Sequence, residues 1–172
     1  MEKTIKLYTL SYSEAKTYWM ALLFVAGNIA LPQLCHLVPQ GGLTWLPIYF
    51  FTLVGAYKYG WKVGLLTAIA SPLVNSMLFG MPAQAMLPAI LMKSTLLAFI
   101  AGWMAQKFGK VTLLALLAVV LTYQCVGTLG EWLMTGSLHA ALQDFRIGLP
   151  GMVVQVLGIF TPEPLSPGSI IT

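Results

Sequence analysis

The chain has 172 residues, of which 58% are hydrophobic and only 8% charged, and its formal net charge is +4. Soluble domains are about 25% charged, so this composition, with a mean hydropathy of +0.83, indicates an integral membrane protein. The basic residues stand singly at the ends of apolar runs. This scatter excludes a nucleic-acid-binding patch and is typical of topology determinants.

Six apolar segments follow one another along the chain. At about 20 residues per span, there is room for five or six transmembrane helices in one domain. The predicted helices cover residues 15–31, 43–57, 63–79, 87–106, 111–130 and 147–160. We therefore predict an all-α integral membrane protein. Its single six-helix transmembrane domain is expected over residues 1–160, and a Pro-rich cytoplasmic tail over residues 161–172.

Prolines and helix lengths refine the predicted positions of the helices. The first helix is expected to run to Leu31 or a little beyond and to end near Pro32, and it should be retained because no clear cleavage site accompanies it. Pro72 is expected to kink the third helix because proline removes a backbone donor. The second and sixth helices are the shortest, since about 15 residues rise only about 22 Å against a hydrocarbon core of about 30 Å. A polar segment over residues 131–144 should separate the last two helices.

Seven of the nine basic residues fall on one predicted side of the membrane. They are Lys3, Lys6 and Lys16 before the first helix, Lys58 and Lys62 in the second turn, and Lys107 and Lys110 in the fourth. The opposite turns, 38–42 and 80–86, carry neither Lys nor Arg. Because positive residues stay inside, both termini are predicted to be cytoplasmic.

Two basic residues, Lys93 and Arg146, depart from this pattern. Lys93 lies about 9 Å below the outer boundary of its helix at 1.5 Å per residue. Its stem could snorkel to the interface, or its cation could face the interior, towards an anionic ligand or a carboxylate such as Glu131 or Asp144. Arg146 is either an interfacial anchor or a second cation of the same site.

Other polar and aromatic side chains fall on the same outer half and would complete a substrate pocket. With Lys93 and Arg146, the candidate substrate-binding residues are Trp45, Asn75, Gln84, Trp132 and His139. Broken or kinked helices expose polar atoms to solutes in this way. For each residue, an aromatic belt or an interhelical hydrogen bond is the alternative.

The sequence holds little that suggests catalysis or metal binding. Cys35 and Cys125 lack a CxxC spacing or neighbouring ligands, so free thiols are expected and no metal or cofactor is predicted. Glu131, His139 and Asp144 form the only acid–base cluster, and their spacing matches no His-Glu-x-x-His motif. We therefore expect the protein not to be an enzyme.

Small residues on the first helix allow a close approach by another helix. Ala26 and Ala30 have the small-xxx-small spacing, which Ala98 and Gly102 share, so it serves either internal packing or a partner. A family resemblance rests on this pattern, on the six predicted spans and on the segments Gly41–Thr44, Leu87–Lys93 and Ala98–Gly102. In these features the chain resembles the substrate-binding S components of energy-coupling-factor (ECF) vitamin transporters.

The resemblance implies a function and a set of partners. Ala26 and Ala30 would dock an integral-membrane coupling subunit, which links the chain to two ATPase subunits, because the sequence has no phosphate-binding P-loop of its own. An outward-facing cavity would capture a vitamin, and Lys93 would contact it or order the cavity. Lys93 and Arg146 favour an anionic or carboxylate-bearing substrate, and the location would be a bacterial or archaeal plasma membrane. A structural or assembly membrane protein without a small ligand is the alternative.

Overall fold

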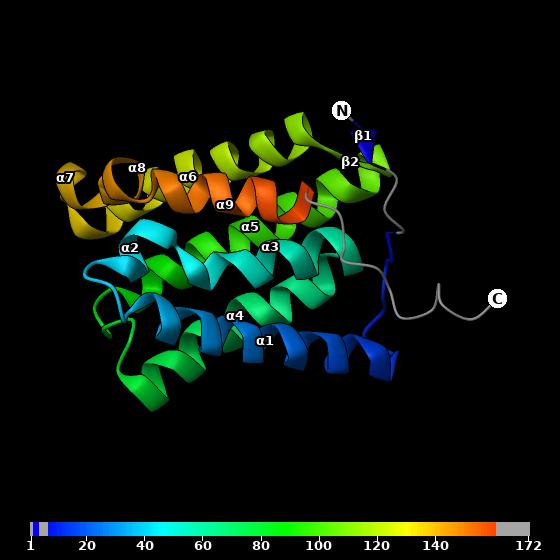
Figure 1. Ribbon diagram of the computed structural model, residues 1–172, viewed down its shortest axis with the longest axis horizontal. Helices are drawn as coiled ribbons and strands as arrows, with labels where there is room; N and C mark the ends of the chain where they lie inside the picture. The colour runs from blue at the N-terminus through cyan, green and yellow to red at the C-terminus, as the bar shows by residue number, and fades with distance from the viewer. Residues whose placement is uncertain (1, 4–6, 161–172) are drawn as a thin grey trace.

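The computed structural model describes residues 2–3 and 7–160 (Figure 1). Lys6 and the predicted tail, residues 161–172, lie outside the described residues. The helices are α1 (Ala15–Cys35), α2 (Gly41–Trp45), α3 (Pro47–Tyr59), α4 (Trp61–Phe79), α5 (Leu87–Phe108), α6 (Leu113–Thr135), α7 (Leu138–Ala141), α8 (Gln143–Ile147) and α9 (Leu149–Phe160). Two short strands, β1 (Glu2–Lys3) and β2 (Val111–Thr112), pair antiparallel.

The chain is an all-α, multi-pass membrane protein. Four of its described helices, α1, α4, α5 and α6, are long and apolar enough to cross a membrane. The other two predicted spans correspond to α3 and α9, which have 13 and 12 residues. Figure 1 shows both running alongside the long helices. α3 is central, since it packs against α1, α4 and α5 and also contacts α9.

The first helix, predicted to end near Pro32, continues to Cys35. A proline within a helix leaves the carbonyl four residues earlier without its usual donor. Here the side chain of Asn75 on α4 takes that place, because its Nδ2 donates to the carbonyl oxygen of Asn28 at 2.8 Å. The helix extends past Pro32 because a hydrogen bond between helices compensates for the missing backbone bond.

The predicted second helix is also not continuous. Leu46 has φ 46° and ψ 46°, a left-handed conformation that separates α2 from α3, and Pro47 begins α3. The expected polar segment over residues 131–144 is itself mostly helical, because α6 extends to Thr135 before α7 and α8 begin. The end of the bundle at α2 and α8 is thus built from short helices and turns.

A buried polar network joins α1, α3 and α4. Asn28 Nδ2 donates to Thr52 Oγ1 at 3.1 Å and to Ser71 Oγ at 3.2 Å. Its Oδ1 accepts from the backbone N–H of Phe51 at 3.2 Å. All three polar side chains are fully buried, so these interhelical bonds fix how the three helices face one another.

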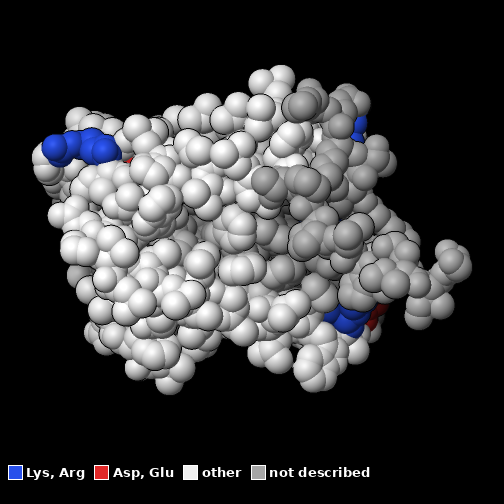
Figure 2. Space-filling view, viewed as in Figure 1, with Lys and Arg blue, Asp and Glu red and all other residues white. Residues whose placement is uncertain are grey.

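The described lysines other than Lys93 gather at one end of the bundle, which we call the lysine end: Lys3, Lys16, Lys58, Lys62, Lys107 and Lys110. The N-terminal segment joins them there, since the Tyr8 N–H donates to the Lys58 carbonyl at 2.8 Å and β1 pairs with β2 beside Lys110. Lys16 and Lys107 lie over the rings of Tyr8 and Trp103, an arrangement suited to a membrane interface. Figure 2 shows a broad face almost free of charge, with charged side chains only at its ends.

Candidate functional site

Three charged side chains meet at the end opposite the lysine end. Lys93 from α5 pairs with Glu131 from α6 and with Asp144 from α8, and its Nζ lies 2.8 Å from Asp144 Oδ2. We call these residues the ion triad. The Lys93 side chain is 3% exposed, and those of Glu131 and Asp144 are 13% and 14% exposed. Lys93 therefore faces the interior, with carboxylates as partners, and does not snorkel to the interface.

A glycine on α6 makes room for the stem of Lys93. A Cβ at Gly127 would lie 2.6 Å from Lys93 Cγ, closer than carbon atoms approach in packed interiors. Gly127 lies four residues before Glu131, so both share one face of α6. The lysine stem can cross α6 at the glycine and reach the carboxylate one turn further on.

Asp144 is brought to the triad by a sharp reversal after α6. Gly136 adopts φ 68° and ends α6, and Ser137 then caps α7 by accepting from the Ala140 N–H at 3.3 Å. This turn folds α8 back against α2 and α9. Asp144 in the first turn of α8 thereby faces Lys93 although it lies 51 residues away in the chain.

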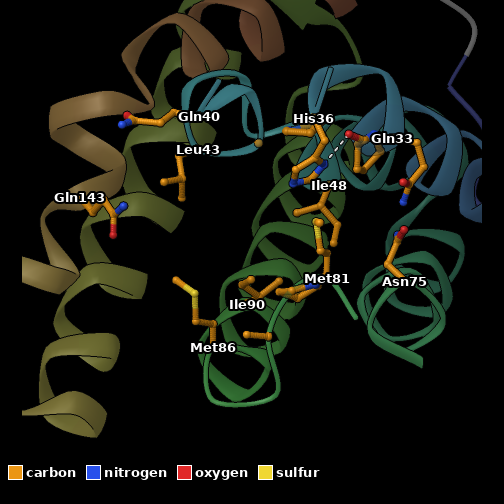
Figure 3. A pocket seen from close by; sticks show the side chains of 15 residues that line it. Gln33, His36, Gln40, Leu43, Ile48, Asn75, Met81, Met86, Ile90 and Gln143 are labelled. Carbon is orange, nitrogen blue, oxygen red and sulfur yellow. Dashed lines mark hydrogen bonds between the residues drawn. The ribbon is translucent and has the colours of Figure 1, made fainter. Parts of the chain in front are cut away.

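Beside the triad is a cavity of about 550 Å³, bounded by α1, α2, α3, α4, α5, α8 and the turn between α4 and α5 (Figure 3). Its size is typical of small-molecule sites. Apolar side chains form most of the wall, among them Leu43, Ile48, Met81, Met86 and Ile90. The polar side chains that line it are Gln33, His36, Gln40, Asn75 and Gln143.

A recess of about 80 Å³ links the cavity to the ion triad. It is lined by Lys93, Glu131, Asp144 and Tyr49. The recess and the cavity also share several lining residues: Gly42, Leu43, Ile48, Met86, Ile90 and Gln143. The two spaces therefore adjoin, and a molecule in the cavity can direct one group towards the carboxylates.

The amide of Asn75 has a fixed orientation in the cavity wall. Its Nδ2 donates to the carbonyl oxygens of Asn28 and Ser71, at 2.8 Å and 3.1 Å. If the amide were flipped, Oδ1 would face the carbonyl oxygens of Asn28 and Ser71, and three acceptors would lie together. Nδ2 therefore faces these carbonyls, and Oδ1 is the amide atom that they leave without a bond. Within the described part of the chain, neither Asn75 Oδ1 nor Gln33 Nε2 has a hydrogen-bond partner, although both atoms are buried.

His36 adds a third oriented polar group. Its Nδ1 lies 2.6 Å from the carbonyl oxygen of Pro32, the dashed contact in Figure 3. Since a carbonyl can only accept, Nδ1 carries the proton and donates. In the neutral ring, Nε2 is then an acceptor. The last turn of α1 and the C-cap residue that follows it thus contribute Gln33 and His36 to the cavity.

Of the predicted site residues, the structure brings only Asn75 and Lys93 to the cavity and its recess. Trp45 and Trp132 are 41% and 42% exposed, and Gln84 is exposed in the turn between α4 and α5. Arg146 lies 2.9 Å from His139 Nε2, and both are exposed. None of these five residues lines either space.

The sequence prediction also missed four polar residues of the wall: Gln33, His36, Gln40 and Gln143. Gln33 and His36 were missed because the first helix was expected to end near Pro32, which would have put both in a loop. Gln143 was assigned to a connecting segment. Gln33 and His36 are three positions apart, which is the spacing of residues on one face of a helix, and this spacing is the signal in the sequence that indicates them.

Comparison with known proteins adds no identification, since no family model, no curated protein and no solved structure matches the chain.

We expect Lys93→Met to lower the free energy of unfolding by about 3–5 kcal/mol, because it leaves two nearly buried carboxylates without their cation. Lys107→Met, at the exposed lysine end, is the matched control and should change it by less than about 1 kcal/mol. Reversible unfolding in mixed detergent micelles measures both. Equal stabilities of the two variants would contradict the structural role given to Lys93.

Proposed function

We propose that the chain is the substrate-binding S component of an ECF-type importer for a vitamin-sized molecule, located in the plasma membrane of a bacterium or archaeon. The observation that carries the proposal is the cavity of about 550 Å³ with its oriented polar groups at one end of the bundle. Such a cavity, apolar with a few convergent polar groups, is the usual form of a small-molecule site. The proposal agrees with the resemblance noted in the sequence.

The position of the cavity supports capture from outside. The cavity lies at the end opposite the lysines, and the positive-inside rule assigns the lysine end to the cytoplasm. We therefore propose six spans with both termini inside. At 1.5 Å per residue, α3 and α9 rise about 20 Å and 18 Å, and local bilayer thinning can accommodate such short helices. The cavity then opens towards the outer side.

The surface of α1 supports docking to a coupling subunit. Ala26 and Ala30 are exposed, and they lie one helical turn apart on the same face as Leu22 and Leu34, which are 58% and 63% exposed. Small residues on a lipid-facing stripe allow a partner helix to approach closely. The chain has no P-loop, so ATPase subunits acting through this partner would supply the energy.

The ion triad changes the expected charge of the substrate. The sequence favoured an anionic vitamin because Lys93 and Arg146 were candidates to bind an anionic group, although a carboxylate partner for Lys93 was the open alternative. Lys93 is paired with two carboxylates, and Arg146 is exposed beside His139 and lines neither the cavity nor its recess, so neither offers its positive charge to a ligand in the cavity. The proposal therefore retains a vitamin-like substrate but no longer an anionic one.

The alternative is a structural or assembly membrane protein. Such a protein would not need a cavity lined by Asn75 Oδ1 and Gln33 Nε2, buried polar atoms that find no partner in the described part of the chain. Unsatisfied buried amides are unfavourable by about 1–3 kcal/mol each. A ligand that bonds to them removes this penalty, which favours the solute-binding function.

Native mass spectrometry of the protein purified in mild detergent should show a small-molecule adduct. Leu43→Trp, which fills the cavity with a larger side chain, should abolish the adduct, whereas Leu114→Trp, on a 77% exposed position of α6, should retain it. A wild-type mass without adduct, together with no thermal shift in a vitamin panel, would support the structural alternative.

Ala26→Leu combined with Ala30→Leu should reduce copurification of the coupling subunit at least about tenfold, because added bulk prevents close helix approach. The adduct should remain, since neither residue lines the cavity. Val126→Leu, at a 45% exposed position of α6, controls for added bulk on the lipid-facing surface. Unchanged copurification in the alanine variant would contradict the proposed docking face.

The proposed orientation is tested with single cysteines in a background in which Cys35 and Cys125 are replaced by Ala. A membrane-impermeant maleimide should label Gln84→Cys on intact cells and Lys107→Cys only after permeabilisation, because the two positions lie at opposite ends. Labelling of Lys107→Cys from outside would reverse the orientation and contradict capture of an external solute.

A further inference from the structure

The ion triad holds more negative than positive charge. Lys93 supplies one cation for the two carboxylates of Glu131 and Asp144. The nearest basic residue in the sequence, Arg146, contacts His139 on the exposed surface, and the other described lysines lie at the lysine end. An excess negative charge within the membrane depth of the protein is unfavourable unless a cation approaches it.

The recess beside the triad is shaped for such a cation. Its volume of about 80 Å³ suits a small charged group, and the carboxylate-bearing residues Glu131 and Asp144 line it. Tyr49, 3% exposed, lines it as well, and aromatic faces attract organic cations. The recess opens on the side of Gln143, Leu43 and Ile48, which also line the large cavity.

A second, independent observation comes from the opposite wall of the cavity. Asn75 is 1% exposed, and its Oδ1, which accepts nothing from the described residues, is held as an acceptor by the two bonds of its Nδ2. The Nε2 atom of His36 is a further acceptor when the ring is neutral. These acceptors match N–H or O–H donors on a ligand, and Gln33 Nε2 supplies one complementary donor beside them.

We propose that the solute is an organic cation, with a protonated amine or amidine in the recess between Glu131 and Asp144 and an N–H group that donates to Asn75 Oδ1. Its apolar body packs against Ile48, Met86 and Ile90. Lys93 does not bind the solute but holds both carboxylates in place. The two carboxylates then pair with two cations, the Lys93 ammonium group and the cationic group of the solute. The inference rests on the proposed solute-binding function and names the substrate class.

The experiment is native mass spectrometry of the full-length protein with three equimolar pools of small molecules. Water-soluble vitamins, nucleobases, amino acids and polyamines are sorted by their charge at neutral pH into a cationic, a neutral and an anionic pool. Adducts are expected from the cationic pool alone. Their affinity should fall about 30-fold or more in Glu131→Gln, the size typical of removing one partner from a buried charge pair. Glu14→Gln, which removes an exposed carboxylate at the lysine end, should bind as the wild type does.

The outcomes separate the two proposals. Adducts from the neutral or anionic pool that persist in Glu131→Gln would overturn the cation inference and leave the solute-binding function standing. A wild type without adducts from any pool would overturn both. The wild-type pools decide the charge class even if Glu131→Gln does not fold, and Asp144→Asn then provides the second test of the carboxylates.

Discussion

The pairing of Lys93 with Glu131 and Asp144 is the constraint on which the end of the bundle opposite the lysine end depends. It ties α5, α6 and α8 together at one point, although α8 is a short helix after a reversal. Charges at this depth are unfavourable when separated, because each would lose hydration without compensation. The arrangement that keeps them together also fixes the recess, and α8 contributes Gln143 to the wall of the cavity beside it.

Interrupted helices create the rest of the cavity. α1 passes Pro32 because Asn75 replaces the missing backbone donor, and this bond leaves Asn75 Oδ1 as the acceptor that faces the cavity. The left-handed backbone at Leu46 separates α2 from α3, so that α2 can lie across the cavity. Irregular backbone within a membrane protein is tolerated where it lines a cavity. The irregular backbone segments therefore lie at the cavity that is the proposed substrate-binding site.

Hydropathy predicted the helical class and the positions of most helices, because lipid exposure requires long apolar runs. Lys93 was predicted as a site residue for the same reason, because it is a charge inside such an apolar run. Asn75 was predicted because it is an amide that follows the kink expected at Pro72. Trp45, Trp132 and Arg146 could not be assigned from sequence, because interfacial and cavity-lining residues have the same composition and differ only in side-chain direction. Gln33 and His36 depended on a hydrogen bond from another helix, which no local pattern reveals.

If Lys93 and its carboxylates act as one unit, the effects of Lys93→Met and Glu131→Gln on the free energy of unfolding are coupled, and a double-mutant cycle measures this coupling. We expect a coupling energy of about 1–3 kcal/mol, with the double variant more stable than the sum of the single effects. Additive effects, within about 0.5 kcal/mol, would show instead that the two side chains do not depend on each other.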